Sequence, residues 1–370
     1  MKKTDKLFAK PKKDIYNLDD KLFFESCKEN CIFEYENNPV YKGIMDKLGF
    51  DVYKVNKTED IPFIPTMYFK HHDMLTFNKK KYAIKGTSSG TSGVNVSTVG
   101  MTYSDIFRGF NMVRRVFSFH KILTFKPHRY IILGYEPNKN NERAISKTSY
   151  GYTLLSPAVS RDYALKYTKD GYKPDIEGLE EKFIKYSKGK IPVRTLGFPS
   201  YTYFLMKDLK EKGIKVKLPK GSSISISGGW KSFYKERVDK QVFYDLASEV
   251  FGIDDKDIYE YYGAVEHPIL YIDCRYHHFH IPEYARVIIR DIETLEPVKD
   301  GEVGLVNLVT PMIFGTPTLS VMTDDLGIVH SEKCPCGCPS KYFEILGRSG
   351  IDDIKTCAQG ADEVLKGGDK

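Results

Sequence analysis

The stretch that decides the fold runs from residue 176 to residue 227 and reads IEGLEEKFIKYSK, GKIP, VRTL, GFP, SYTYFLMKDLKEK, GIKVKLPKGS and SISIS. The segments 176–188 and 200–212 predict helices, and the segments 193–196 and 223–227 predict strands. Strands that alternate with helices in this way are typical of a layered α/β domain.

The alternation continues on both sides of this stretch. Upstream, the apolar segment 129–135 predicts a buried strand, and a helix is expected from about Ser104. The apolar stripe of that helix would consist of Ile106, Phe107, Phe110, Val113 and Phe117. Downstream, a further helix is expected at 234–251.

The predicted secondary structure changes beyond residue 258, where strands replace the alternation of strands and helices. The strand-like segments are 284–291, 302–310 and 319–329, and a hairpin turn is expected at 297–301. Four consecutive parts are therefore expected: a flexible basic arm at 1–16, an α/β core at 17–257, a β-rich lobe at 258–346 and a hinge-like C-terminal segment at 347–370.

A buried helical face is predicted near the N-terminus, from residue 17 onward. Its apolar residues recur at three- and four-residue steps and are Leu22, Phe23, Cys27, Cys31 and Ile32. This periodicity assigns the first two cysteines to the core rather than to a site.

Composition limits the class of protein. With 370 residues, 41% of them hydrophobic, the chain can bury a substantial core, which excludes a largely disordered protein. The net charge of +7 is spread along the chain and does not require nucleic acid as a partner. Because the sequence has neither a membrane-spanning apolar run nor a secretion signal, we expect a cytoplasmic protein.

A loop rich in glycine and hydroxyl residues follows the β-like segment 82–84. It begins at Gly86, and its candidate phosphate-binding residues are Thr87, Ser88, Ser89, Gly90, Thr91, Ser92 and Gly93. Glycine permits close backbone approach, and N–H groups with hydroxyls can surround phosphate oxygens. The lysine of an ordinary P-loop is missing, and composition alone fits a flexible surface loop equally well.

Four further motifs follow in order: Ser227-Gly228-Gly229, Tyr261-Tyr262-Gly263-Ala264-Val265-Glu266, Thr323-Asp324-Asp325 and Gly347-Arg348. Together with the loop they resemble the adenylate-forming superfamily, which activates carboxylates with ATP. The resemblance implies the large N-terminal α/β domain of that superfamily, with the first two motifs beside adenine. It also implies that Glu266 helps to hold Mg²⁺, that Asp325 binds the ribose and that Arg348 reaches the nucleotide.

Each of these residues also has a structural alternative when it is taken singly. Asp325 could cap a turn, Glu266 could be a solvated carboxylate and Tyr262 could belong to the core. The chemistry is nevertheless coherent, because carboxylate attack on the α-phosphate builds negative charge. Loop N–H groups, a Mg²⁺ held by Glu266, and Arg348 would offset that charge.

Cysteine and histidine residues offer a tetrahedral zinc set in the β-rich lobe. The set consists of Cys274, His280, Cys334 and Cys336, with His277, His278 and Cys338 as rival ligands and free loop thiols as the alternative. Phenylacetate-CoA ligases carry a similar Cys-x-Cys-Gly element, and the resemblance implies a structural zinc.

The motifs are most similar to those of LuxE-type acyl-protein synthetases, over about residues 15 to 365. The resemblance implies that a long-chain fatty acid and ATP give acyl-AMP, and that Cys357 then takes the acyl group for a reductase partner. A thiol suits this step because its thiolate is a strong nucleophile. Lys355 is near enough in sequence to lower the pKa of Cys357, although the family's Arg-Gly-Cys triplet is replaced here by Lys355-Thr356-Cys357.

The chain ends at Lys370, so we expect it to lack the mobile C-terminal domain of most superfamily members. Two alternatives stay open: a ligase that transfers an acyl or aryl group to coenzyme A or a carrier protein, and a non-catalytic subunit that docks a reductase. The chain length of the acid is also open, with Phe198, Tyr201 and Phe204 as candidate pocket residues. The sequence leaves the oligomeric state open too, including a homo-oligomer.

Overall fold

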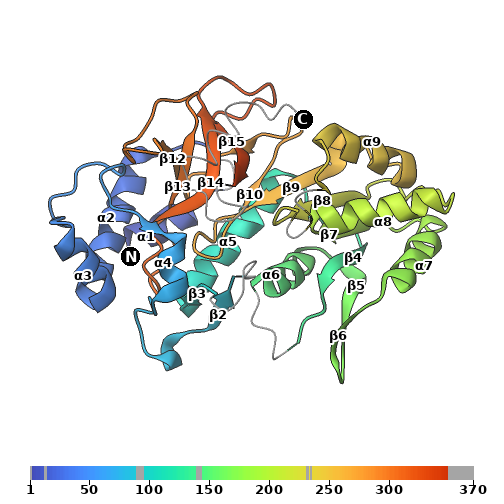
Figure 1. Cartoon of the computed structure of the whole chain (residues 1–370), viewed down its shortest axis with the longest axis horizontal. Coiled ribbons are helices and arrows are strands. Elements are labelled where there is room, and N and C mark those ends of the chain that lie inside the picture. The colour runs from blue at the N-terminus through green and yellow to red at the C-terminus, as the bar shows by residue number, and fades with distance from the viewer. Residues whose placement is uncertain are drawn as a thin grey trace. The chain divides into compact units, whose positions relative to one another are not determined.

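The computed structural model describes residues 2–11, 15–88, 96–138, 144–230, 233 and 236–348. The chain divides into two compact units. Unit 1 comprises Met1–Phe119, Gly263–Tyr271 and His278–Lys370, and unit 2 comprises His120–Tyr262 and Ile272–His277. This division differs from the four consecutive parts expected from the sequence, because the polypeptide leaves the first unit and later returns to it (Figure 1).

Within the described residues, unit 2 is built on a seven-stranded sheet with the strand order β10-β9-β8-β7-β4-β5-β6. The neighbours from β9 to β5 are parallel, and β5 forms an antiparallel hairpin with β6. The strands are β4 (His128–Tyr135), β5 (Ala158–Thr168), β6 (Gly171–Pro174), β7 (Val193–Gly197), β8 (Ser223–Ser227), β9 (Ile258–Tyr262) and β10 (Tyr271–Ile272).

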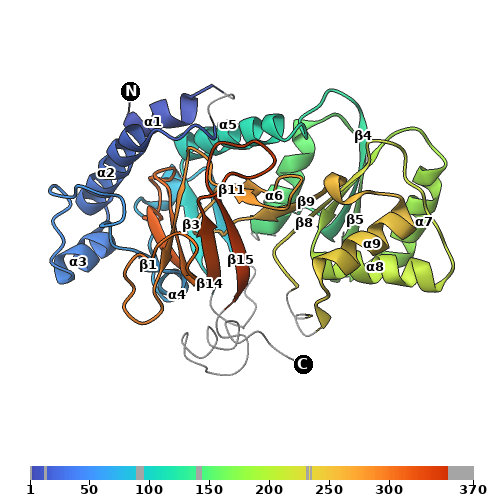
Figure 2. The same ribbon diagram turned by 90° about the horizontal axis from the view of Figure 1, so that it is seen from above.

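The helices of unit 2 are α6 (Ala144–Tyr152), α7 (Ile176–Ser187), α8 (Pro199–Glu211) and α9 (Lys240–Phe251). Figures 1 and 2 show α7, α8 and α9 together on one face of the sheet, with α6 on the other face. The core under α7 and α9 includes Phe183 and Phe251, whose rings stack with centroids 4.7 Å apart. The alternation predicted from residue 176 onward is thus confirmed.

A buried histidine at the start of β4 makes the stability of unit 2 depend on pH. The Nδ1 of His128 lies 2.8 Å from the carbonyl oxygen of Lys126, and burial lowers the pKa of His128 to about 4. Below about pH 6.5 the His128 imidazole binds a proton in the unfolded chain, whereas in the folded chain it stays neutral until the pH approaches 4. The contribution of His128 to the free energy of unfolding is therefore fully present above about pH 6.5 and is lost as the pH falls toward 4.

Chemical denaturation at several pH values should detect this effect. We expect the free energy of unfolding to fall by up to about 1.4 kcal/mol per pH unit between pH 6 and pH 4, and His128→Gln to flatten that slope. The matched control is His72→Gln at an exposed position. Equal slopes in the wild type and the His128 variant would contradict the prediction.

Among the described residues, unit 1 carries a six-stranded sheet with the order β11-β15-β14-β13-β12 and β1 beside β14. A separate hairpin pairs β2 with β3. The strands are β1 (Ile64–Pro65), β2 (Ile84–Thr87), β3 (Thr98–Met101), β11 (Phe279–His280), β12 (Arg286–Arg290), β13 (Gly304–Val309), β14 (Ser320–His330) and β15 (Tyr342–Arg348). The β-rich texture predicted beyond residue 258 is present in this sheet.

The helices of unit 1 are α1 (Lys3–Ala9), α2 (Asp20–Asn37), α3 (Pro39–Lys47), α4 (Thr66–His71) and α5 (Tyr103–Phe119). Cys27 and Cys31 are fully buried on α2, as the periodicity predicted. Within the described chain, no helix is long and apolar enough to cross a lipid bilayer.

The segment expected to be a flexible arm instead contains α1. Leu7 and Phe8 of this helix are buried, and the ring of Phe8 stacks on Tyr284 at 4.8 Å. The composition of residues 1–16 is basic, but two adjacent apolar side chains are enough to dock a short helix when a complementary core receives them.

The inner face of α5 is not the apolar stripe that its sequence suggested. Phe107 and Phe110 are exposed by 67% and 54%, whereas Asp105 and Arg108 are buried. Phe117 is buried as predicted, but in the first half of the helix the buried face contains the ion pair of Asp105 with Arg108 in place of Phe107 and Phe110.

Candidate functional site

Two of the predicted nucleotide motifs meet at the carboxyl edge of the unit 2 sheet. Strands β8 and β9 are parallel neighbours, and Ser227 is paired with Tyr261 in their register. Gly228 and Gly229 follow with φ values of +75° and +65°. Only glycine adopts two such left-handed conformations in succession at little cost, so the turn explains both glycines.

This edge is where open parallel sheets bind ligands, because the loops after successive strands converge there. Tyr261 is buried, and its hydroxyl accepts a hydrogen bond from Ser225 at 3.0 Å. Its ring lies edge-on against Tyr152 of α6, with centroids 5.7 Å apart. Tyr262 is half-buried.

A small pocket lies at the ends of β4 and β7, next to α6. Its lining residues are Ile132, Leu133, Gly134, Tyr135, Ser146, Ser149, Leu196, Gly197 and Phe198. Of the three aromatic residues suggested for the acid pocket, Phe198 lines it. Tyr201 and Phe204 instead contact the ring of Phe233, with centroids 6.1 and 5.1 Å apart.

The candidate phosphate loop is carried by the β2–β3 hairpin of unit 1. Thr87 is paired with Thr98 in the register, the N–H of Ser88 donates to the carbonyl of Ser97 at 3.0 Å, and the N–H of Ser97 donates to Oγ of Ser88 at 3.1 Å. The hairpin thus fixes both ends of the loop. The remaining predicted loop residues, 89–93, lie outside the described residues.

Asp325 and Arg348 are brought together by the unit 1 sheet. They are directly opposite each other in the antiparallel register of β14 and β15. The backbone N–H of Asp325 donates to the hydroxyl of Thr323 at 3.2 Å, and that hydroxyl donates to the carbonyl of Val306 at 3.0 Å. The sequence separates the two residues, and only strand pairing makes them neighbours.

Glu266 lies on a tight turn of unit 1. The turn is closed by the N–H of His267, which donates to the carbonyl of Ala264 at 3.1 Å. A Cβ atom on Gly263 would lie 2.9 Å from the carbonyl oxygen of Ile269, so the glycine of this motif is required by close backbone approach. Glu266 itself is 5% exposed.

Three of the predicted metal ligands come together in unit 1. The ligand atoms of His280, Cys334 and Cys336 lie within 4.8 Å of one another, and the Nε2 of His280 is 3.1 Å from the Sγ of Cys336. The other ring nitrogen, Nδ1, is 3.2 Å from the carbonyl oxygen of Ser340, which orients the imidazole as second-shell partners do in metal sites. This cluster has the composition to hold a metal ion.

The turn of the Cys-x-Cys-Gly element shapes the cluster. Gly337 has φ +84°, and its N–H donates to the carbonyl of Cys334 at 3.0 Å. The N–H groups of Cys336 and Cys338 point at the sulfur two residues earlier, at 3.5 and 3.4 Å. Such N–H contacts stabilise thiolates, which are the form that binds metal.

The rival ligands have partners of their own. The Nδ1 of His277 lies 2.8 Å from a carboxylate oxygen of Asp273, both in unit 2. The Nδ1 of His278 lies 3.3 Å from the Sγ of Cys334, so His278 borders the cluster. Cys274 belongs to the 272–277 segment of unit 2 and remains a predicted fourth ligand.

The predicted acceptor, Cys357, lies outside the described residues. The sequence interpretation also missed buried polar residues of unit 1 that contact the 312–316 segment or strand β3, above all Asp105, Arg108 and Thr316. A signal was available for the first, because Thr102 and Asp105 are spaced as a capping box: the N–H of Thr102 donates to Oδ2 of Asp105 at 2.8 Å, and the N–H of Asp105 donates to Oγ1 of Thr102 at 3.3 Å.

Comparison with solved structures identifies the fold. The open conformation of 2-hydroxyisobutyryl-CoA ligase in complex with 2-HIB-AMP and CoA superposes with a TM-score of 0.71 at 16% identity, covering 91% of this chain and 76% of that one. The predicted α/β domain of an adenylate-forming enzyme is therefore confirmed at the level of fold.

Comparison with curated proteins gives relatives that match about nine tenths of this chain. The long-chain-fatty-acid–luciferin-component ligase of Aliivibrio fischeri is 26% identical over 334 residues, which cover 90% of this chain and 84% of that protein. The phenylacetate-coenzyme A ligase of Thermus thermophilus is 24% identical over 341 residues, which cover 89% and 70%. The family model for LuxE, the acyl-protein synthetases, matches residues 5–366. The chain therefore belongs to the LuxE family of acyl-protein synthetases.

Proposed function

We propose that this protein activates a long-chain fatty acid with ATP and then acylates its own Cys357. In the first step a carboxylate oxygen attacks the α-phosphorus of ATP, the bond to the β-phosphate oxygen breaks, and pyrophosphate leaves. In the second step the sulfur attacks the acyl carbonyl and AMP leaves, while the thiol proton passes to solvent. The observation that carries the proposal is the family match over residues 5–366.

The nucleotide roles are proposed from the family resemblance, and the placement of the motifs within each unit supports them. The Thr87–Gly93 loop would surround the phosphates, and Asp325 would bind the ribose hydroxyls with Arg348 opposite it on β15. Ser227, Gly228 and Gly229 would border adenine, with Tyr261 and Tyr262 on the neighbouring strand. Glu266 would hold the Mg²⁺ that offsets the phosphate charge.

The small pocket at the ends of β4 and β7 in unit 2 has space for about one water molecule, so it would border the carboxylate end of the acid and not hold its chain. Ile132, Leu133, Leu196 and Phe198 supply an apolar lining, whereas Ser146 and Ser149 place hydroxyls on the α6 side. Apolar walls with a few polar groups are typical of small-molecule sites.

A reductase partner would receive the thioester, because a thioester is reactive enough for reduction to the aldehyde. The 24% identity to a phenylacetate-coenzyme A ligase supports a second candidate, transfer of an acyl or aryl group to coenzyme A. The two candidate functions differ in the final acceptor of the acyl group, which is a cysteine of the protein in the first and coenzyme A in the second.

The proposed function is tested by acid-dependent exchange of radiolabelled pyrophosphate into ATP. Wild-type protein with Mg²⁺ and a C14 or C16 acid should catalyse the exchange, and Asp325→Ala should lower it at least ~100-fold, because ribose contacts position the α-phosphate for attack. The control is Asp170→Ala at an exposed ion pair with Lys173, which should exchange normally. Exchange that does not depend on added acid would refute the proposal.

We further propose that Cys274, His280, Cys334 and Cys336 bind a structural Zn²⁺. Metal analysis should find one zinc per chain, and removal by a chelator should lower Tm by about 5–10 °C, since closed zinc sites contribute folding energy. Cys336→Ser should lose the metal, whereas Cys338→Ser should keep it. If Cys336→Ser retains zinc and Cys338→Ser loses it, then Cys338 and not Cys336 is the ligand.

A further inference from the structure

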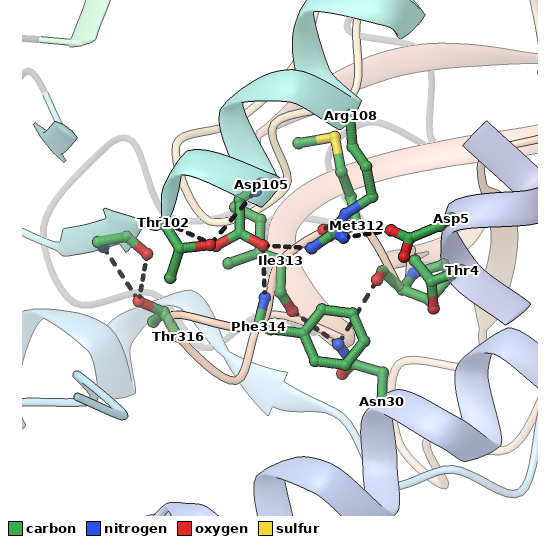
Figure 3. A network of polar contacts seen from close by, with 12 residues as sticks. Thr4, Asp5, Asn30, Thr102, Asp105, Arg108, Met312, Ile313, Phe314 and Thr316 are labelled. Atoms are coloured by element: carbon green, nitrogen blue, oxygen red, sulfur yellow. Dashed lines mark hydrogen bonds and ion pairs between the residues drawn. The ribbon is translucent and has the colours of Figure 1, made fainter. Parts of the chain in front are cut away.

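Polar contacts lie inside unit 1 along residues 311–316, and the backbone of this segment joins them (Figure 3). The side chains come from α1, α2, α5 and the 311–316 segment itself, and we call them the anchor network: Asp5, Asn30, Asp105, Arg108 and Thr316. Four of the five side chains are buried, the exception being Asp5 at the rim. Buried polar groups of this kind specify a unique geometry when they are satisfied.

Three side chains of the network bind three consecutive residues of the backbone. Arg108 Nε donates to the carbonyl of Met312 at 2.8 Å, and Asn30 Nδ2 donates to the carbonyl of Ile313 at 2.6 Å. Asp105 Oδ1 accepts from the N–H of Phe314 at 3.1 Å. The segment therefore has no freedom to shift along its own direction.

Arg108 connects these bonds to the N-terminal helix. Its Nη2 donates to Oδ1 of Asp105 at 2.5 Å and its Nη1 donates to Oδ1 of Asp5 at 2.7 Å. Hydrogen bonds between a guanidinium and two carboxylates are strong and directional. The fork thus ties α1 and α5 to the 311–316 segment.

Thr316 carries the network to strand β3. Its Oγ1 accepts from the N–H of Gly100 at 3.0 Å and donates to the carbonyl of the same residue at 3.2 Å. The approach is close: a Cβ on Gly100 would lie 2.5 Å from the ring of Tyr82, and a Cβ on Gly315 would collide with the Gly100 carbonyl. The hydroxyl of Thr316 therefore satisfies both the N–H and the carbonyl of Gly100 where the two segments touch.

Gly100 lies within the hairpin that carries the candidate phosphate loop. It is opposite Lys85 in the register, two residues before the pair formed by Thr87 and Thr98 along the hairpin. A shift of Gly100 by a fraction of its hydrogen-bond length would be transmitted through the strand pairing to both ends of the loop.

We infer that the anchor network holds the β2–β3 hairpin in the position that ATP binding requires, and that Thr316 is its last link. This inference rests on the proposed nucleotide function. Thr316 touches backbone rather than substrate, so it is a positioning residue. The loss of its hydroxyl should therefore affect how ATP is held more than whether the chain folds.

The test compares Thr316→Val with Thr316→Ser in the acid-dependent ATP–pyrophosphate exchange assay, at a temperature well below Tm. Valine keeps the volume and removes the hydroxyl, and it should raise the KM for ATP about tenfold with a smaller change in kcat. Serine restores the hydroxyl and should return the KM to within about twofold of wild type. Amide hydrogen exchange should also accelerate at residues 98–101 in the valine variant only.

Thr195→Val is the matched control, because Thr195 is a buried threonine of unit 2 whose hydroxyl has no hydrogen-bond partner among the described residues. It should leave the KM for ATP unchanged. Two results would overturn the positioning role while leaving the proposed function intact. In the first, the wild type is active and Thr316→Val has the same KM for ATP as the wild type. In the second, Thr316→Ser raises the KM for ATP as much as Thr316→Val does. A wild type with no acid-dependent exchange would overturn the proposed function and this inference with it.

Discussion

Replacing Cys357 with alanine is expected to abolish the acyl label that the protein retains after incubation with ATP, Mg²⁺ and radiolabelled fatty acid. Acid-dependent ATP–pyrophosphate exchange should continue near the wild-type rate, because adenylate formation does not use the thiol. The effect on retained label should be at least ~100-fold, because hydroxyls and amines are weak nucleophiles at neutral pH and the cysteines of the described chain lie in the core or at the candidate metal cluster. Retained label is measured after denaturation and gel separation, with hydroxylamine to cleave thioesters.

Cys27→Ala is the control for the loss of a thiol elsewhere. Burial raises the pKa of Cys27 well above its usual value, so this thiol stays protonated and inaccessible in the core of unit 1. Its removal should leave the label in place. Hydroxylamine-sensitive label that persists in Cys357→Ala would assign the acceptor to another residue.

The second large effect is expected from Arg108→Met, which should lower the free energy of unfolding by about 3–5 kcal/mol. Methionine removes the guanidinium that compensates Asp105, and it leaves a carboxylate fully buried among α5 and the 311–316 segment. Uncompensated buried charge is among the most destabilising changes a point substitution can make. Urea denaturation followed by circular dichroism measures the change.

An exposed ion pair provides the comparison for Arg108. Lys173→Met breaks the contact between Lys173 and Asp170, whose side chains are 58% and 74% exposed, and should cost less than about 1 kcal/mol. If Arg108→Met and Lys173→Met lower the free energy of unfolding by similar amounts, the predicted stabilising role of the Asp105–Arg108 pair is contradicted.

The sequence was sufficient to predict much of the fold. Apolar periodicity located α2, and the alternation from residue 176 onward located the strands and helices of unit 2. It failed for the first half of α5, because the buried face of that half contains an ion pair. No periodicity analysis assigns Asp105 and Arg108 to a core, since their burial depends on partners more than 200 residues away, at Met312 and Phe314.

In the candidate site, too, some features could be predicted from local sequence, whereas others depend on tertiary contacts. Local motifs predicted the Ser227–Gly229 turn, whose positive φ values require glycine, and a metal cluster that contains His280 and Cys336. The pairing of Asp325 with Arg348 depends on strand register, which sequence does not reveal. Thr316 was missed because its role lies in a contact with the backbone of Gly100, and backbone contacts leave no side-chain signature in the partner.

The most direct measurement of the central claim, self-acylation driven by ATP, is the intact mass of the protein. After incubation with ATP, Mg²⁺ and a mixture of fatty acids, we predict a gain equal to one acyl group, dependent on ATP and reversed by hydroxylamine. An unchanged protein mass, with the acyl group recovered instead on added coenzyme A, would contradict the account.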